Sequence, residues 1–187
     1  MAITKLIIAV LAVFAAATTG ADARRNNRRG PKNNGSGSAC SEDALEMVRL
    51  VNEYREQNGK PTVPVSSSMC ITADAHVKDA IVLGTDNGQC NLHSWLDCCY
   101  TGQNHECVWD KPSQLTCYPG NGYENSAWTS TGKLSPADAL EMWKRSGGHN
   151  NMMLNIGGWE RVEFKAMGAG FGGGFAHLWF GMEPDCQ

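Results

Sequence analysis

Cysteine is the residue type whose number and spacing in this sequence most directly predict chemistry. Eight cysteines occur among 187 residues, and five of them lie between positions 90 and 117. An even number in a secreted chain predicts four disulfide bonds. Adjacent Cys98 and Cys99 are expected to bond to different partners, because a ring between neighbours is strained. The pairing is left open by the sequence; the eight residues are Cys40, Cys70, Cys90, Cys98, Cys99, Cys107, Cys117 and Cys186.

A thiolate zinc site is the alternative for the same region. Its ligands would come from Cys90, His93, Cys98, Cys99, His105 and Cys107. Thiolates and imidazoles are good zinc ligands, but these spacings match none of the CxxC-type frameworks in which they usually occur. Oxidation outside the cell also favours disulfides over thiolates. We therefore expect disulfide bonds in this region.

Two further motifs suggest enzymes but lack the context that those enzymes need. Residues 168–173 (GAGFGG) satisfy the GxGxxG pattern, but dinucleotide binding needs a helix after that pattern, and a strand is predicted there. Ser94 and Ser146 each lie near a histidine in the sequence, yet no GxSxG elbow is present. We therefore expect neither a dinucleotide-dependent enzyme nor a serine hydrolase.

Three helices are predicted from capping residues and apolar periodicity. The first follows Ser41 and ends before Gly59, and the second covers residues 72–83. The third begins at Ser135, where a capping serine is followed by a proline and then by Asp138, and it ends at Gly147. The positions of the second helix that are predicted to face inward are Ala73, Val77, Ala80 and Ile81.

The end of the chain predicts an antiparallel hairpin. Residues 160–167 alternate between apolar and polar side chains, 168–174 are rich in glycine, and 175–180 form a second apolar run. Most of the segment 85–134 is predicted to be loop, apart from short stretches at 93–95 and 123–128. Helices first and an antiparallel pair last indicate the α+β class.

The beginning of the chain has the features of a secretory signal peptide. Lys5 is followed by an apolar run from Leu6 to Ala17, and Ala21-Asp22-Ala23 fits a cleavage site, so residues 1–23 are assigned to the signal. The apolar run is too short to span a bilayer. Residues 24–39 carry a charge of +5, and they are expected to be a disordered basic tail or a short propeptide. The one N-glycosylation sequon, at Asn34, lies in this segment.

The composition of residues 40–187 restricts the function classes that remain. This part carries 10 basic and 18 acidic residues, a net charge of −8, whereas a nucleic-acid-binding domain is normally basic. The whole chain is 42% hydrophobic and has six tryptophans, which excludes a wholly disordered protein. We therefore expect one folded domain over residues 40–187, without a nucleic-acid partner.

Five short stretches occur in an order that is typical of one extracellular family. They are Asn52-x-Tyr54-Arg55, His93-Ser94, Glu124-Asn125, Trp143-x-x-Ser146-Gly-Gly-His149-Asn-x-Met-x-Leu154 and Trp179-Phe180-Gly181. This order resembles the CAP superfamily of SCP-like extracellular domains, which includes cysteine-rich secretory proteins, insect antigen 5 and plant pathogenesis-related proteins of class 1. The resemblance covers about residues 41–182. It implies a three-layer α-β-α sandwich with a small antiparallel sheet and a solvent-facing groove.

The resemblance also implies a site, because in that family two histidines and two acids converge in the groove and some members hold a divalent cation there. By position, His93 and His149 match the two histidines and Glu124 matches the first acid. The position of the second acid is occupied by residues 144–146 (KRS), so Glu141 on the same helix is a weaker candidate. Imidazole and carboxylate suit a cation such as zinc. A hydrogen-bonded polar cluster without a cation is the alternative.

The remaining histidines and four tryptophans are not expected to bind a cation. His76 is predicted to lie on the surface of the second helix, and His105 and His177 are expected to be structural. Trp95, Trp109, Trp128 and Trp159 are candidates to line an exposed binding surface.

Three functions follow from these expectations. The first is a secreted, monomeric, non-enzymatic binding module for a lipid or sterol, a glycan or a protein, as the family implies for some members. The second is a metal-dependent hydrolase with zinc on His93 and His149 and with Glu124 as general base. The third is an extracellular matrix protein that binds extracellular polymers or cations.

Overall fold

A computed structural model describes residues 39–85 and 88–186. The predicted signal peptide and almost all of the predicted tail lie outside the described residues. The helices are α1 (Glu42–Gln57), α2 (Ser67–Leu83), α3 (Glu106–Trp109), α4 (Lys111–Leu115), α5 (Pro136–Lys144) and α6 (Gly147–Leu154), and the strands are β1 (Gly122–Trp128), β2 (Ala166–Gly172) and β3 (Phe175–Gly181). None of the helices in this part of the chain is both long enough and apolar enough to cross a bilayer.

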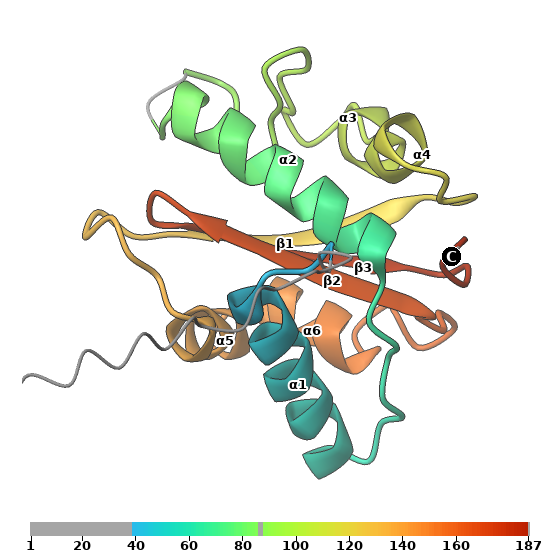
Figure 1. Ribbon diagram of the computed structural model, residues 1–187. Coiled ribbons are helices and arrows are strands. Elements are labelled where there is room, and N and C mark those ends of the chain that lie inside the picture. Colours follow the sequence, from blue (N-terminus) through green and yellow to red (C-terminus); the bar gives the residue numbers. More distant parts are fainter. Residues whose placement is uncertain (1–38, 86–87, 187) are drawn as a thin grey trace, which may run out of the picture. The chain divides into compact units, whose positions relative to one another are not determined.

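The strands form one antiparallel sheet between two layers of helices, with α2, α3 and α4 on one side and α1, α5 and α6 on the other (Figure 1). The strand order is β1-β3-β2, so the last strand lies in the middle. Glu124 of β1 and Gly168 of β2 both pair with Trp179 of β3. The predicted α+β class and three-layer sandwich are therefore confirmed.

The glycine-rich segment was wrongly predicted to be a turn, because it forms most of β2. The strand begins at Ala166, and only Gly173 and Gly174 make the turn to β3. Glycine is needed in β2 because α2 packs directly on it. A Cβ added at Gly168 would lie 2.4 Å from the backbone nitrogen of Cys70. The strand predicted over 160–167 is wrong for residues 160–165, which lie outside any strand. Burial still alternates around Phe164, whose two neighbours are exposed, but Ala166 and Met167 are both buried.

The helix ends follow the capping residues. Ser41 accepts a hydrogen bond from the backbone N–H of Ala44, and Ser135 accepts one from Asp138, so the predicted starts of α1 and α5 are confirmed. The helix α2 begins at Ser67, five residues before its predicted start, because Ser66 caps it. The pair α3 and α4 lies in a region that was predicted to be loop.

Four disulfide bonds join the eight cysteines, and all of these residues are described. The pairs are Cys40–Cys70, Cys90–Cys99, Cys98–Cys107 and Cys117–Cys186. The expectation that Cys98 and Cys99 have different partners is confirmed, and no thiol remains for a thiolate zinc site. Two of the bonds hold the segment that carries His93.

The first helix is tied to α6 by a buried arginine. Arg55 Nε donates to the carbonyl oxygen of Pro61 (2.8 Å), and Nη1 donates to the carbonyl oxygen of Met153 and to Asn155 Oδ1 (2.5 and 2.7 Å). Burial lowers the pKa of Arg55. This contact fixes α6, the helix that carries His149, against the core.

Candidate binding site

The centre of the site is Glu124, which β1 places between the sheet and α2. Its side chain is completely buried. Oε1 lies 2.5 Å from His76 Nδ1 and 2.8 Å from His177 Nδ1, and Oε2 lies 2.7 Å from His93 Nδ1. Three imidazoles from α2, from the loop at 93 and from β3 therefore surround one carboxylate.

The position of His76 corrects the prediction that it lies on the surface. It is fully buried on the face of α2 that packs on the sheet. Its ring stacks on that of Trp95 at a centroid distance of 4.3 Å and on that of His177 at 4.0 Å. The ring nitrogen that does not face Glu124, Nε2, lies 2.9 Å from the carbonyl oxygen of Ser94.

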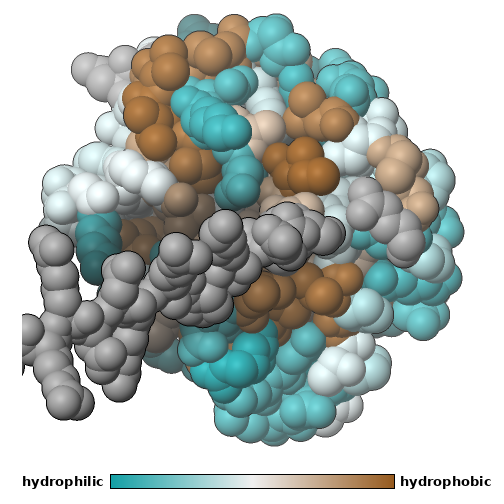
Figure 2. Space-filling model, in the orientation of Figure 1, coloured by the Kyte–Doolittle hydropathy of each residue, from teal (hydrophilic) through white to brown (hydrophobic). Residues whose placement is uncertain are grey.

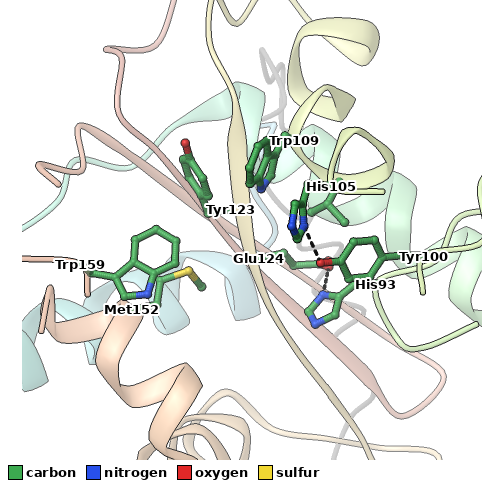
Figure 3. Close-up of a pocket in the computed structure, with 9 residues that line it drawn as sticks. His93, Tyr100, His105, Trp109, Tyr123, Glu124, Met152 and Trp159 are labelled. Atoms are coloured by element: carbon green, nitrogen blue, oxygen red, sulfur yellow. Dashed lines mark hydrogen bonds and ion pairs between the residues drawn. The ribbon is translucent and has the colours of Figure 1, made fainter. Parts of the chain in front are cut away.

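His93 is the member of the cluster that reaches solvent, with 24% of its side chain exposed. Besides Glu124, its Nδ1 lies 3.2 Å from Ser126 Oγ, and the same hydroxyl lies 3.1 Å from His177 Nδ1. The other ring nitrogen, Nε2, points away from Glu124 (Figure 3). Since Nδ1 is occupied, Nε2 is the atom of His93 that remains for a ligand.

His177 is buried in the middle strand, and its Nε2 has no hydrogen-bond partner among the described residues. One ligand atom each from His76, Glu124 and His177 lies within 4.8 Å of the others, so this buried group could hold a metal ion. As the side chains lie, however, both Glu124 oxygens already contact imidazole nitrogens. A cation would have to displace the protons that these contacts share.

The charges in the cluster are set by competition between burial and neighbouring groups. Burial disfavours the Glu124 carboxylate, but the charges and hydrogen bonds of His76 and His177 outweigh burial and hold its pKa well below the ordinary value. Burial likewise opposes a charge on His76, yet Glu124 raises the pKa of that histidine. Burial and the positive charge of His76 lower the pKa of His177 to about 4. The directions of these shifts favour a charged His76–Glu124 pair beside a neutral His177.

His149 lies at the edge of this cluster. Asn125, the residue after Glu124, donates from its side chain to the backbone carbonyl oxygen of His149 (3.2 Å). Tyr54 Oη donates to Asn150 Oδ1 (2.9 Å), which fixes the same turn of α6. Burial and the nearby His93 lower the pKa of His149. No hydrogen bond joins the His149 ring to Glu124 in the described structure.

Glu141 is not brought to the cluster. It lies on the exposed side of α5, where its carboxylate accepts a hydrogen bond from Lys144 Nζ (2.8 Å). Of the four residues predicted for the site, the structure therefore joins His93 directly to Glu124, places His149 nearby, and leaves Glu141 in solvent.

A pocket lined largely by aromatic rings opens beside His93 (Figure 3). Its volume is about 260 Å³. The residues that line it, called the aromatic pocket below, are His93, Tyr100, His105, Val108, Trp109, Tyr123, Glu124, Met152 and Trp159. His105 stacks on Trp109 at 4.8 Å, and Tyr123 meets Trp159 edge-on at 5.3 Å. The predicted roles of Trp109 and Trp159 at a surface agree with this arrangement, whereas Trp95 is buried.

A second pocket of about 440 Å³ is lined in part by Ser126, the residue whose hydroxyl contacts His93, and we call it the His149 pocket. It is lined by Thr85, Leu92, Ser126, Ala127, Trp128, Met142, Trp143, Ser146 and His149. Elsewhere on the surface, hydrophobic residues gather over the C-terminal end of α2 (Figure 2), where Val82 is 71% exposed.

Sequence reasoning missed His76 and His177 as members of the cluster. The spacing of His76 indicates that it faces inward, because Ala73, His76 and Ala80 recur at the three- and four-residue intervals that place residues on one helical face. Ile81, which was predicted to face inward, is 50% exposed. His177 shares one face of β3 with Trp179, but that pattern alone does not say which group of the neighbouring strand lies opposite.

Comparison with known proteins agrees with the architecture. Residues 48–157 match the CAP family, described as the cysteine-rich secretory protein family. No curated protein matched the sequence. Two similar solved structures are an extracellular protein containing a SCP domain from Bacillus anthracis (18% identity, TM-score 0.53) and a cysteine-rich secretory protein from Staphylococcus aureus (13%, 0.52). Each covers 75% of this chain, but this chain spans only 40% and 38% of theirs.

A third similar structure is an outer surface protein of Borrelia burgdorferi, with 14% identity and a TM-score of 0.52 over 76% of this chain and 94% of that one. At these identities the likeness concerns the fold. The family match covers more than half of the sequence and includes His93, Glu124 and His149. The chain therefore belongs to the cysteine-rich secretory protein (CAP) family.

Proposed function

We propose that this chain is a secreted, non-enzymatic binding module that holds an apolar ligand with a ring-containing body, such as a sterol or another lipid, in the aromatic pocket. The observation that carries the proposal is the lining of that pocket. Tyr100, Trp109, Tyr123 and Trp159 supply flat apolar surface, and His93 supplies one polar atom. Small-molecule sites generally combine a mostly apolar wall with a few fixed polar groups.

Secretion is supported by three observations of different kinds. The sequence begins with the features of a signal peptide. The described chain has four disulfide bonds and no free cysteine, which suits an oxidising compartment. Similar structures include proteins described as extracellular or outer-surface.

The state of Glu124 disfavours the hydrolase alternative. A general base must reach a water molecule and must hold a pKa near the working pH. Both Glu124 oxygens are occupied by imidazole nitrogens, the side chain is completely buried, and its pKa lies well below the ordinary value. The carboxylate is therefore suited to orient His93 rather than to activate water.

Binding of radiolabelled cholesterol to the disulfide-bonded protein tests the proposal. Trp109→Ala and Trp159→Ala should each weaken binding by about tenfold or more, since each removes a large aromatic contact. Trp128→Ala is the matched control, because Trp128 lines the His149 pocket instead. Equal binding by all three variants would contradict the assignment of the pocket. Binding of chitohexaose in place of the sterol would identify a glycan module.

A divalent cation such as zinc is a second candidate ligand, because His76, Glu124 and His177 could hold a metal ion. Zinc titration by calorimetry of His177→Gln and His149→Gln separates two locations. Heat that is lost in His177→Gln alone would place the ion in the buried group, whereas heat that is lost in His149→Gln alone would place it between His93 and His149. An absence of heat with the wild type would exclude both.

A further inference from the structure

The two edges of the sheet differ in how they are covered. The strand β2 lies at one edge, where Ser66 N–H donates to the carbonyl oxygen of Met167 (2.8 Å) and Met167 N–H donates to that of Pro64 (2.9 Å). The strand β1 lies at the other edge. Among the described residues, no backbone–backbone hydrogen bond covers its outer side. Such an open edge is a template for pairing with another chain.

The register shows which main-chain groups of β1 face this open edge. Opposite residues of two antiparallel strands alternate between pairs that exchange hydrogen bonds and pairs that do not. Thr129 and Gly174 continue the register of β1 with β3, and Thr129 N–H donates to the carbonyl oxygen of Gly174 (2.9 Å). Every second residue counted back from Thr129 is therefore bonded to β3. Glu124, Ser126 and Trp128 lie in between, so their N–H and C=O groups point away from β3.

Two observations agree with this assignment. The carbonyl oxygen of Ser126 accepts a hydrogen bond from Trp143 Nε1 of α5, which lies outside the sheet (3.1 Å). The side chain of Glu124 is completely buried, whereas the residue as a whole is 8% exposed, so its exposed surface belongs to the main chain. Neither the N–H nor the C=O of Glu124 has a hydrogen-bond partner within the described chain. These accessible polar groups need a partner from water or from another chain.

Both pockets described above lie along the same edge. Because its side chain is buried, Glu124 lines the aromatic pocket through its main chain. A few residues further along β1, residues 126–128 line the His149 pocket. Leu92, Met142 and Trp143 make much of the remaining wall of that pocket apolar. A chain laid along β1 would therefore find, next to the open main-chain groups, an apolar hollow for one of its side chains.

A positive charge lies beside the His149 pocket. Arg145 directly precedes Ser146, which lines the pocket. Its side chain is exposed, and it forms no hydrogen bond or ion pair with the described residues. The neighbouring Lys144, in contrast, is already paired with Glu141 (2.8 Å). Complementary charges fix the register of a partner, so Arg145 favours a partner with an acidic residue close to its apolar one.

We infer that the edge of β1 from Glu124 to Trp128 binds an extended peptide segment of another protein by strand addition, with an apolar side chain in the His149 pocket and an acidic residue near Arg145. A peptide main chain carries N–H and C=O groups at the spacing that an open strand requires, whereas a lipid does not. The inference goes beyond the proposed function, because its anchoring pocket is not the one assigned to the ring-containing ligand.

Amide hydrogen exchange of the 15N-labelled, disulfide-bonded chain tests the edge and its occupant. EDTA keeps cations away from the neighbouring histidines. In the free protein, the Glu124 amide should exchange faster than the Asn125 amide, which is bonded to β3. The probe is the acetylated and amidated heptapeptide Thr-Val-Thr-Leu-Thr-Glu-Thr. At millimolar concentration it should slow exchange at Glu124 by about tenfold or more. A Glu124 amide that stays unprotected would overturn the pairing.

N-methylation of the probe separates strand pairing from recognition of side chains alone. Along a paired strand, alternate N–H groups face the partner strand and the others face away. A single N-methyl group, moved along the central residues of the probe, should weaken binding by about tenfold at every second position and have little effect in between. Effects that do not alternate would show that the main chain is not paired with β1, and strand addition would be wrong.

Variants of the two pockets separate this inference from the proposed function. Trp128→Ala should weaken binding of the probe by about tenfold and leave cholesterol binding unchanged, while Trp109→Ala should do the reverse. Met142→Ala is the second variant of the His149 pocket, at a position that is 41% exposed, should Trp128→Ala fail to fold. Probe binding that survives in folded variants of the His149 pocket would contradict the anchor, whatever the result with cholesterol.

A pair of charge reversals tests the acidic contact. Arg145→Glu should weaken binding of the probe severalfold, because it places like charges together. Lys133→Glu is the control, since it makes the same change of charge at an exposed position that does not line the His149 pocket. Equal effects of the two variants would mean that the net charge of the domain, rather than Arg145, acts on the probe.

A second copy of the chain is the competing occupant, because two open edges can pair with each other. Analytical ultracentrifugation of the free protein distinguishes the two. The chain should sediment as a monomer, and the Glu124 amide should exchange at the same rate at low and high protein concentration. A dimer in which that amide is already protected would show that the edge is filled by the chain itself, and the assignment to a peptide of another protein would be wrong.

Discussion

Gly170 of β2 lies directly against the backbone of Ala73 in α2. A Cβ added at Gly170 would lie 2.6 Å from the carbonyl carbon of Ala73, and one added at Gly168 would lie 2.4 Å from the nitrogen of Cys70. The helix that carries His76 therefore packs on the sheet at a distance that only glycine permits. This close approach brings the His76 ring within reach of Glu124 on the same sheet.

Replacement of Gly170 by alanine should consequently destabilise the folded protein strongly. Backbone atoms cannot rotate away as a side chain can, so we expect Gly170→Ala to lower the free energy of unfolding by about 3 kcal/mol or more. Gly147→Ala is the control, because a Cβ there meets no atom within 4 Å and its position in α6 favours alanine over glycine. Urea unfolding of both variants checks this. Equal stability of the two would contradict the packing.

The stability of the fold should decrease as the pH falls from about 6.5 toward 4. The pKa of His177 is about 4 in the folded protein and 6.5 ordinarily, so the unfolded chain binds a proton in this range while the folded chain does not. The lost stability is on the order of 3 kcal/mol. The raised pKa of His76 adds no slope here, because its contribution is already complete below 6.5.

The variant His177→Gln isolates that effect. Urea midpoints measured between pH 7 and 4.5 should fall more steeply for the wild type than for the variant. The lowered pKa of His149 acts in the same direction in both proteins and therefore cancels in the comparison. Parallel pH profiles would show that His177 is not held neutral.

The disulfide bonds should contribute according to the chain length that they close. Cys117–Cys186 spans 69 residues and Cys90–Cys99 spans 9. Loop-closure entropy predicts losses of about 4 and about 3 kcal/mol when each pair is replaced by serine. Thermal unfolding of the two double-serine variants tests this order. A larger loss for the shorter loop would mean that native contacts outweigh the entropy of the unfolded chain.

Two arginines on α1 allow buried hydrogen bonds, made by Arg55, to be compared with exposed ion pairs, made by Arg49. Arg55→Lys should cost about 1.5–3 kcal/mol, because lysine cannot replace the buried contacts to Pro61, Met153 and Asn155 together. Arg49→Lys should cost less than about 1 kcal/mol, since its partners Glu46 and Glu53 are half exposed. Guanidinium chloride unfolding of both variants provides the measurement. Similar losses would contradict the structural role of Arg55.

Local signals predicted the parts of the fold that depend on neighbouring residues. Ser41 and Ser135 marked helix starts because a capping side chain acts within three residues. The extent of β2 escaped prediction because glycine favours turns when it is considered alone. Its place in a strand depends on α2, which lies about 100 residues earlier and excludes larger side chains.

In the site, too, some residues could be predicted from the sequence and others depend on distant segments of the chain. His93 and Glu124 were predicted from a family pattern, and the structure joins them at 2.7 Å. His76 was wrongly expected on the surface from its position between Ala75 and Val77, whereas its three-residue spacing from Ala73 puts it on the buried face. The partners of His177 follow from strand pairing: Ser126 of β1 lies opposite His177 in the register, and Glu124 lies two residues away on the same face.

The ring closed by Cys90–Cys99 contains both His93 and Ser94. Glu124 and His177, in contrast, are held by paired strands, and His76 is held by a helix. The half of the site that meets solvent therefore lies inside a short disulfide-closed ring. The buried half lies on paired strands and on α2, which a disulfide holds only near its start, at Cys70. Removal of this bond alone, by serine at both positions, would loosen the histidine that meets solvent before it loosens the carboxylate behind it, so binding should disappear while the sandwich is still folded.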